Sequence, residues 1–511
     1  MKSCASPLPA SVPWLTLSLV IPLAGALLVA LAPSEARRVV KQLGVLSAVI
    51  TLVLVVAIIG GFQQGVGNLH LQFEETLRWI PSAGISYHLG VDGLSLFLLG
   101  LNALLFLLAI VIVDPLMPRL KQFILLLLIL EAATAGILLS LDLILFYVFW
   151  EAMLVPLYFL IGVWGEGRRV YAAFKFLIYT VIGSFAMLVA ILAVAAINFS
   201  QTGQLSFDWT VLVQHPAAGI WHLPAGLGTI GIQQLLFIGF GLAFAIKMPI
   251  FPLHTWLPPA YTSSPIPVVI VFAGLVSKLG AYGFLRFNLA LFPDAAHSLG
   301  GLLAVLATIG ILYGAFMALV QTDLKRLVAY ASMSHLGFIG LGIFAGNLLG
   351  IEGALVQMIN HGVIIAALFL VVGMIERRAG TRLRAELQGL AATAPLFAAL
   401  FLVVSLAALG LPGLNGFVGE FLIMLGAWAS FIPMAVGAGV GVILAAWYVL
   451  RFYQGSTQEA PPRPSGFGEL RAAEVGVLAP LLALMVLIGV SPAFFPAAVD
   501  ATVKALPVLL R

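Results

Sequence analysis

The sequence predicts an all-α polytopic membrane protein with about fourteen transmembrane helices, two of them broken. Of its 511 residues, 62% are hydrophobic and only 9% are charged, whereas soluble domains carry about 25% charged residues. Apolar runs of roughly 20 residues, the length that crosses a bilayer, recur along the whole chain. They begin near Val12, Val39, Leu89, Gln122, Leu143, Ala173, Gly231, Ser264, Gly300, Leu324, Ile351, Gly389, Phe417 and Val475.

Basic residues are distributed unevenly between alternate loops. If the N-terminus lies outside and fourteen helices follow, 17 of the 24 Lys and Arg fall in inside loops. The others are Lys2, Arg78, Lys504 and Arg511 outside, and Lys247, Lys278 and Arg286 in or near spans. This asymmetry obeys the positive-inside rule, so we expect both termini to face outside. Basic residues follow the first apolar run, which favours a retained span over a cleaved signal peptide.

Composition excludes several kinds of function. The single cysteine, Cys4, rules out a disulfide framework and a cysteine-ligated iron–sulfur cluster on this chain. The sequence contains no Walker A motif and no dinucleotide-binding fingerprint after a strand. The polar stretches 62–88, 199–230 and 454–474 are short enough to be loops. We therefore expect no soluble domain, no cofactor, no metal and no nucleic-acid binding on this chain.

Two apolar regions are interrupted beside an ionisable residue. In AIKMPIFPLHTW the helix must break at Pro249 and Pro252, and in ALGLPGLNGFVGE it must break at Pro412. Two broken helices in corresponding halves of a chain are typical of inverted-repeat transporters. Non-helical backbone at this depth is tolerated only where protein or water satisfies it. The alternative is a pair of unrelated proline kinks.

Four ionisable residues, Glu151, Lys247, Lys278 and Glu420, lie inside predicted spans. A charge at the centre of a bilayer costs on the order of 3 kcal/mol on insertion scales, so each is a candidate functional residue. Glu151 could alternatively serve only as a hydrogen-bond partner for a neighbouring helix, and Glu420 could be an acid stabilised by a helix N-terminus. Arg286 lies near the end of its span, and we expect its side chain to snorkel to the membrane surface.

Three further residues extend this set. Glu131 lies in a neighbouring span and could supply a second carboxylate near Glu151. His335 and His361 lie in successive spans, and imidazole titrates in the range useful for proton transfer. A lone helical histidine is more often a structural group, and this pair lacks metal-ligand spacing such as HExxH. His254, after the first break, could mark a water entrance on the inside face.

Alternating buried acids and bases predict a path for protons or other ions. Moving a proton from Lys247 to a neighbouring group changes the electrostatic field at Glu151. An opposite charge a few ångströms away changes proton affinity by about 1–3 pK units. A row of such sites can pass an electrostatic disturbance along the membrane and release protons at one end.

At these residues the chain resembles the antiporter-like membrane subunits of complex I. The resemblance is to the M (chain 4) type of proton-translocating NADH:quinone oxidoreductase and its plastoquinone-linked relatives, and it covers nearly the whole chain. It rests on the motifs FYVFWEAMLVPLYFLIGVWG, AIKMPIFPLHTWLP, LVSKLGAYGFLRF, TDLKRLVAYASMSHLGF and GLPGLNGFVGEF.

The resemblance implies a fourteen-helix fold with two inverted five-helix repeats and broken seventh and twelfth helices. The implied division is 1–118 for helices 1–3 and an outside loop, 119–290 and 291–453 for the two repeats, and 454–511 for an inside loop and helix 14.

It also implies roles for four residues: a pair formed by Glu151 and Lys247, a central Lys278 and a terminal Glu420. The sister L and N subunits generally have lysine at the terminal position, so Glu420 favours the M type.

One segment departs from the family pattern. After the first break the family commonly reads LPDAHTEAPT, whereas this chain reads LPPAYTSSPI. Pro259, Tyr261 and Ser263 therefore replace an Asp, a His and a Glu, which we expect on the inside face where protons could enter. The departure indicates a specialised paralogue, such as a D subunit of a cyanobacterial CO2-uptake NDH-1 complex.

The sequence thus predicts a transport subunit of a redox-driven proton pump. NAD(P)H or ferredoxin, FMN, iron–sulfur clusters and quinone would bind to partner subunits. The implied neighbours are the L/F-type and N/B-type antiporter-like subunits, in a bacterial inner membrane or a cyanobacterial thylakoid. One alternative is a subunit of a multisubunit sodium/proton antiporter. Another is a membrane scaffold whose buried charges serve only helix packing.

Overall fold

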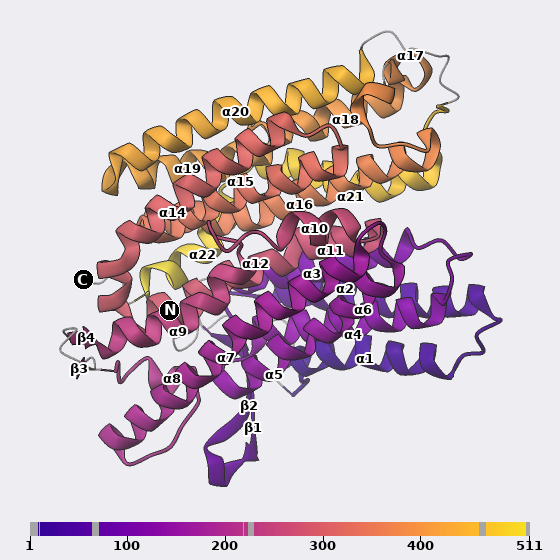
Figure 1. Cartoon of the computed structure of the whole chain (residues 1–511). Coiled ribbons are helices and arrows are strands. Elements are labelled where there is room, and N and C mark those ends of the chain that lie inside the picture. Colours follow the sequence, from indigo (N-terminus) through magenta and orange to yellow (C-terminus); the bar gives the residue numbers. More distant parts are fainter. Residues whose placement is uncertain are drawn as a thin grey trace.

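The chain folds into a bundle of apolar helices that lie roughly side by side (Figure 1). The computed structural model describes residues 9, 11–63, 71–217, 219–222, 229–387, 389–458 and 467–506. Lys2, Cys4, Arg463 and Arg511, on which some of the predictions above depend, lie outside these residues.

Helices that cross the bundle before the first break are mostly unbroken. They are α1 (Trp14–Leu31), α2 (Arg37–Gly61), α3 (Leu96–Val111), α4 (Leu120–Leu139), the nearly continuous α5 (Leu143–Ala152) and α6 (Leu154–Trp164), and α7 (Arg169–Thr202). A short α8 (Trp209–Leu212) follows. Asp142 begins α5 by accepting hydrogen bonds from two backbone amides of the first turn.

The middle of the chain contains the first break and the most buried helices. The elements are α9 (Ile232–Lys247), α10 (Leu257–Ser263), α11 (Ile266–Val271), the π-helix η4 (Phe272–Val276), α12 (Ser277–Gly283), the π-helix η5 (Phe284–Asn288), α13 (Leu289–Leu291), α14 (Pro293–Val320), α15 (Leu324–Phe344) and α16 (Leu348–Ala379). The spans 266–291, 324–344 and 348–379 are buried along their whole apolar windows. They form the centre around which the other helices pack.

The C-terminal part contains the second break. Its elements are the 3-10 turn η6 (Arg384–Glu386), α17 (Leu390–Thr393), α18 (Pro395–Ala408), α19 (Asn415–Ser430), α20 (Ile432–Thr457), α21 (Ala472–Val490) and α22 (Phe494–Lys504). A single run beginning near Phe417 was predicted here, and this boundary is wrong. Phe431 leaves the helical region and Pro433 begins a new first turn, so α19 and α20 are separate helices.

The predicted number of spans agrees with the structure. Among the described residues, eleven helices are long and apolar enough to cross a membrane, and α3, α9 and α18 are shorter apolar helices. The short α9 and α10 together make one broken span, and α18 and α19 make another. The fold is therefore an all-α polytopic bundle with broken seventh and twelfth spans.

Two short hairpins lie in segments that the sequence presented as loops. β1 (Gln72–Ile80) pairs antiparallel with β2 (Ile85–Val91), and β3 (Ile220–His222) with β4 (Thr229–Gly231). The turn between β1 and β2 is a 3-10 turn, η2 (Pro81–Ala83), closed by Gly84 at φ +67°, a conformation that glycine adopts without strain. The β1–β2 hairpin projects from the helix ends (Figure 1).

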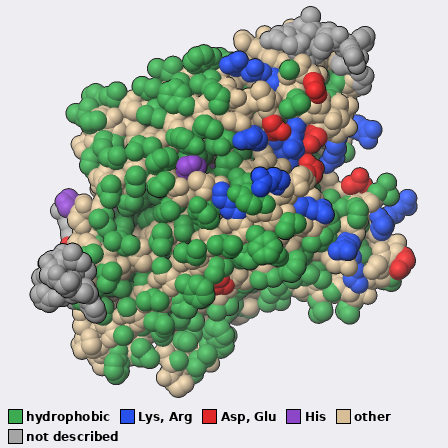
Figure 2. Space-filling model, viewed as in Figure 1, with side chains coloured by type: hydrophobic (Ala, Val, Ile, Leu, Met, Phe, Trp, Pro, Cys, Tyr) green, Lys and Arg blue, Asp and Glu red, His purple; other side chains and the backbone are tan. Residues whose placement is uncertain are grey.

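The surface has the character of a membrane protein. Hydrophobic side chains cover most of the face in Figure 2, and Lys and Arg gather along one edge of it. We use the name basic end for the end of the bundle that contains Arg38, Lys41, Arg377 and Arg471, which line two adjoining cavities. Lipid replaces water as the solvent of the apolar belt, so broad exposed apolar surface is expected there.

Both ends of the described chain approach the β1–β2 hairpin side of the bundle. The Leu15 amide at the start of α1 donates to Glu75 of β1 at 2.7 Å. Near the other end, Thr502 of α22 accepts a hydrogen bond from the Gly93 amide at 3.2 Å. An even number of spans places the first and last helix ends on the same side.

Candidate functional site

Lys247 is the last residue of α9 and lies at the first helix break. The helix ends at Lys247, and the turn that follows contains a cis peptide bond between Phe251 and Pro252. A carbonyl released by the break still has a partner, because Trp256 donates its indole N–H to Ile246 O at 2.8 Å. Protein therefore satisfies the broken backbone. A cation is favoured at this position, since the partial negative charge of a helix C-terminus lies there.

The Lys247 ammonium is surrounded by aromatic rings. The residue is 1% exposed, and its Nζ lies 4.9 Å from the ring centroid of Trp150 and 5.4 Å from that of Phe176. Desolvated cation–π contacts of this kind contribute about 2 kcal/mol. The sequence analysis did not identify Trp150, although its position directly before Glu151 was a usable signal.

Glu151 is the acidic group whose charge acts on Lys247. Among the described residues, however, the two do not form an ion pair within 4.0 Å, and both Lys247 Nζ and Glu151 Oε1 are buried without a hydrogen-bond partner. The structure therefore brings the expected pair into electrostatic range but not into direct contact. The ring of Trp150 packs against the ammonium instead.

Lys278 is fully buried at the centre of the bundle and follows a π-helix. Its Nζ donates to the carbonyl of Ala273 in η4 and to Ser277 Oγ at 3.4 Å. π-Helical turns occur frequently at functional sites because they redirect backbone groups. The turn also permits close helix packing: a Cβ added at Gly362 of α16 would come within 2.6 Å of Gly274 O. His361 directly precedes Gly362 in α16, and the charge of Lys278 acts on it.

A row of buried side chains continues from this lysine towards the second break. Its first member, His361, has no hydrogen-bond partner among the described residues, and the hydrogen bonds begin at His335. The rings of His361 and His335 lie 5.6 Å apart, and Nδ1 of His335 lies 2.8 Å from Glu420 Oε1. Gln357 donates to the same carboxylate oxygen at 3.2 Å, and the Tyr448 hydroxyl lies 3.4 Å from His335 Nε2. The structure thus brings three predicted residues together and adds Gln357 and Tyr448, which sequence analysis missed.

Glu420 is the sixth residue of α19, and its partners distinguish the two interpretations of its role. A capping acid would accept hydrogen bonds from the first backbone amides of the helix. Instead, Glu420 accepts a hydrogen bond from Gln357 on α16 and shares one with His335 on α15. The break before α19 is formed by Gly410 and Gly413, at φ +76° and +93°, a region that disfavours residues with a Cβ.

Glu131 stands apart from the other candidates. It is fully buried in α4, and both of its carboxylate oxygens lack a hydrogen-bond partner in the part of the chain that the structure describes. Its backbone carbonyl accepts from Asn102 and Thr134, at 3.3 and 3.0 Å. No described hydrogen bond or ion pair joins it to Glu151. Its role as a second carboxylate beside that residue stays a prediction.

The expectation that Arg286 snorkels to the surface is wrong. Arg286 is 1% exposed and pairs with the buried Asp92 at 2.6 Å, while its Nε donates to the Tyr282 hydroxyl at 3.1 Å. Its guanidinium also lies 5.0 Å from the ring centroid of Trp209. The chain between β2 and α3 brings Asp92 onto the helix end, so a partner reaches the arginine inside the protein.

The departure LPPAYTSSPI forms α10 and the start of α11. Tyr261 and Ser263 are buried, and the Tyr261 ring lies 5.1 Å from that of Phe272 and 6.0 Å from that of Phe369. His254 is buried as well, with its ring 5.4 Å from that of Phe251. The packing of α10 against the centre explains why these positions are covered. A role of this segment at a proton entrance on the inside face stays a prediction.

Outside the spans, two acidic residues contact His88 of β2, and a third accepts a hydrogen bond from another residue of the same strand. Its Nδ1 lies 2.6 Å from Asp208 and its Nε2 3.3 Å from Glu74, while Asp142 accepts from the neighbouring Ser86 amide at 2.9 Å. Burial alone would lower the pKa of His88, but its hydrogen bonds and charge interactions with Asp208 and Glu74 raise that pKa above its ordinary value. The described residues contain no cluster of three or more His, Cys, Asp or Glu arranged to hold a metal.

A membrane bundle with two broken helices and a buried row of ionisable side chains defines an antiporter-like transport protein. Residues 140–445 match the transmembrane family NADH:quinone oxidoreductase/Mrp antiporter. NADH-quinone oxidoreductase subunit M of Rhodobacter capsulatus is 40% identical over 461 residues, which cover 89% of this chain and 88% of the relative. The chain therefore belongs to this family.

Solved structures give the same fold. A chain of respiratory complex I from Thermus thermophilus has a TM-score of 0.85 and 32% identity, covering 97% of this chain and 99% of that one. A chain of the Mrp complex from Dietzia sp. has a TM-score of 0.81 at 22% identity, covering 97% of both chains. The second likeness supports the fold alone.

Proposed function

We propose that this chain is the M-type proton-translocating membrane subunit of a redox-driven NADH:quinone oxidoreductase. The observation that carries the proposal is the buried group formed by His361, His335 and Glu420 beside Lys278. The subunit M relative supports the redox assignment, because it matches almost the whole chain. Electron carriers and quinone would bind to partner subunits, and this chain would move only protons.

The proposed path has two parts. In the first, a proton moves to or from Lys247, whose charge interacts with Glu151. In the second, the charge of Lys278 acts on His361, and the imidazole of His335 exchanges a proton with Glu420 across their hydrogen bond. Each transfer changes the field at the next site, and fields act strongly here because the surrounding protein has a low dielectric constant. Glu131 would join the first part as a separate proton store.

The two parts correspond to the two halves of the chain, with 119–290 as the first antiporter-like repeat and 291–453 as its inverted partner. Residues 1–118 and 454–511 would flank the repeats, and the L-type and N-type subunits would be neighbours of this chain in the membrane. The basic end would face the inside of a bacterial membrane and both termini the outside, since loops rich in Lys and Arg are retained inside.

The main rival is a subunit of a multisubunit sodium/proton antiporter, which would have the same fold but no redox partners. The likeness to the Mrp complex does not favour it, because at 22% identity it concerns the fold alone. A CO2-uptake paralogue rests only on LPPAYTSSPI, a segment whose Tyr261 and Ser263 are buried. A structural scaffold would give no functional reason why Lys247 Nζ and the Glu131 carboxylate are buried without a hydrogen-bond partner among the described residues.

The test uses the intact assembly, purified through a tag on this chain and reconstituted in vesicles. We expect redox subunits to co-purify, and NADH oxidation to acidify one side of the membrane. Glu151→Gln and Lys247→Met should assemble normally and lose most of the coupled proton movement, whereas Arg326→Gln, an exposed charge outside the path, should retain it. Sodium-dependent proton exchange without redox subunits would establish the antiporter instead. Full pumping in both path variants would establish the scaffold.

A further inference from the structure

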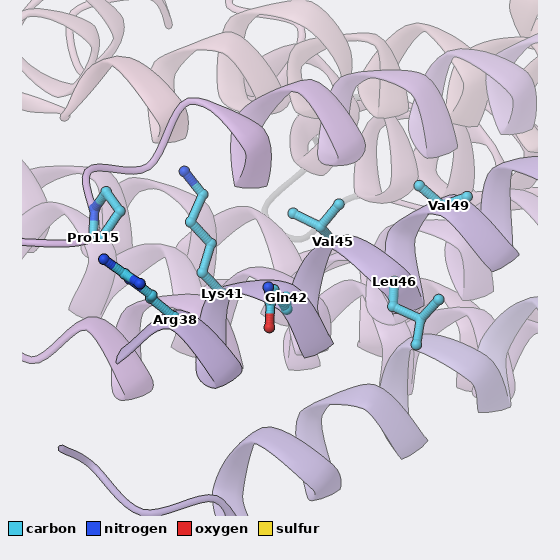
Figure 3. Close-up of a pocket in the computed structure, with 7 residues that line it drawn as sticks. All are labelled: Arg38, Lys41, Gln42, Val45, Leu46, Val49 and Pro115. Carbon is cyan, nitrogen blue, oxygen red and sulfur yellow. The ribbon is translucent and has the colours of Figure 1, made fainter. Parts of the chain in front are cut away.

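Two adjoining cavities of different character lie beside α2 at the basic end. One has a volume of about 470 Å³ and is lined by Arg38, Lys41, Gln42, Val45, Leu46, Val49 and Pro115 (Figure 3). The other, of about 460 Å³, includes Lys41 and Pro115 together with Asp114, Arg377, Arg471 and Glu474. The two cavities share Lys41 and Pro115, so they meet at the lysine.

The first cavity is a groove along an exposed apolar face of α2. Figure 3 shows Val45, Leu46 and Val49 along one side of α2, with Arg38 and Lys41 at one end. Leu46 is 55% exposed and Val49 39%. Eleven residues separate Arg38 from Val49, which corresponds to roughly 16 Å along a helix. This length matches about half of a hydrocarbon core roughly 30 Å thick.

The second cavity holds cations that the protein leaves without acidic partners. Among the described residues, Arg377 and Arg471 form no ion pair with an acidic side chain. Lys41 donates to Val113 O at 2.7 Å and has two further ammonium hydrogens.

The two acids in that cavity are already engaged. Asp114 accepts the Leu116 amide at 2.8 Å, and Glu474 is paired with Arg378. The charges of Asp114 and Glu474 also act on Lys41 and Arg471. Three basic residues still line the cavity against two acids, one of which is paired with Arg378, so the cavity can accept an additional anion.

We propose that the two cavities together bind one anionic phospholipid of the leaflet at the basic end. Its phosphate would lie among Lys41, Arg377 and Arg471, and an acyl chain would follow Val45 and Val49 along α2. A phosphate matches the cations, and the apolar groove beside them requires a hydrocarbon chain on the same molecule. Basic pockets between helices on the inside of membranes bind lipid headgroups by this chemistry. The lipid would join α2 to α16 and α21, because residues of all three helices line the second cavity.

The test measures lipid binding to the intact complex after detergent removal of bound lipids. Native mass spectrometry would follow titration with dioleoyl-phosphatidylglycerol, and dioleoyl-phosphatidylcholine would serve as the uncharged probe. The variant Arg377→Gln/Arg471→Gln should weaken phosphatidylglycerol binding at one site by about 30-fold, because each basic residue near the surface contributes about fivefold. Arg326→Gln is the matched control for loss of charge at an exposed position.

A second variant tests the groove separately. Leu46→Trp would fill it while keeping every charge and the apolar surface that faces lipid, so insertion in the membrane should be normal. Ile443→Trp, at a residue 69% exposed on α20, is its control. We expect Leu46→Trp to abolish the same binding event that the arginine variant weakens.

Three results would overturn the proposal. One is equal binding of phosphatidylcholine and phosphatidylglycerol at this site. Another is unchanged phosphatidylglycerol binding in Leu46→Trp. The third is displacement of the lipid by inorganic phosphate alone, which would show that the site takes a free anion without a hydrocarbon chain.

Discussion

His335 and Glu420 join α15 to the helix that follows the second break: Nδ1 of the imidazole lies 2.8 Å from Oε1 of the carboxylate, and both side chains are buried. The two residues are 85 positions apart in the chain. Gln357 donates to the same oxygen, which fixes the carboxylate towards the imidazole. A proton can therefore pass between the two groups without movement of either helix.

Substitution of either partner should stop this transfer. We expect His335→Gln and Glu420→Gln each to lower proton movement through this chain by about 100-fold, the scale of a positioned acid–base group. The double variant should be no slower than either single variant, because residues that share one step are not additive. Proton uptake by vesicles containing the complex, driven by NADH, measures all three. Additive losses would show that the residues act separately.

Substitution of Trp150 should reduce proton movement as much as substitution of Glu151, the ionisable residue beside it. Trp150→Leu removes the ring that faces the Lys247 ammonium and costs about 2 kcal/mol of its stabilisation. Trp150→Phe keeps an aromatic face and should retain most of the proton movement. Ser184→Ala removes only the hydrogen bond that the indole makes, at 3.1 Å, and serves as the control. Equal proton movement in Trp150→Leu and the wild type would exclude a role for this contact.

The buried pair of Arg286 and Asp92 should stabilise the fold near the hairpin side. Asp92→Asn leaves a buried guanidinium without its counter-charge and should destabilise the protein by about 3–5 kcal/mol. The double variant Asp92→Leu/Arg286→Met removes both charges and should recover most of the loss. Thermal inactivation of the purified complex gives the comparison. A double variant less stable than Asp92→Asn would contradict this explanation.

The contacts of His88 should make the β1–β2 hairpin sensitive to pH. Because the pKa of His88 is raised in the folded protein, its stabilising effect is complete below about pH 6.5 and is lost as the pH rises through the raised value. Burial alone would raise the pKa of Asp208, but its hydrogen bonds to His88 and Thr210 lower that pKa below its ordinary value. The stabilisation that the Asp208 carboxylate gives to the fold is therefore lost only in acid.

Hydrogen exchange of the hairpin amides measures this effect. We expect faster exchange at pH 9 than at pH 6, after correction for the intrinsic rate, and no such difference in His88→Gln. A wild-type hairpin with the same corrected exchange at both pH values would refute the assignment.

Much of the fold follows directly from the sequence. The length of each apolar run and the positions of Lys and Arg predict the spans, because a bilayer imposes both. Pro249 and Pro412 predict the two breaks, since a proline inside a helix removes a backbone hydrogen bond. The β1–β2 hairpin was not predicted, because its polar strands carry no strong alternation of apolar residues. The boundary between α19 and α20 was missed because apolar residues continue across Phe431.

The site was predicted in part. A charged residue inside an apolar run can be recognised in the sequence, because placing a charge in the membrane is energetically costly. Lys247, Lys278 and Glu420 were predicted on this basis. Their partners depend on tertiary packing. Nothing in the sequence places Gln357 against Glu420, and nothing places Asp92 against an arginine almost two hundred residues away.

We expect the buried ionisable residues of this chain to carry protons rather than only to hold helices together. The most direct test is the number of protons moved per electron by vesicles containing the complex with Lys278→Met, compared with the exposed Lys504→Met. We expect Lys278→Met to assemble, oxidise NADH and move fewer protons per electron, and Lys504→Met to match the wild type. An unchanged ratio in a fully assembled Lys278→Met complex would contradict the claim.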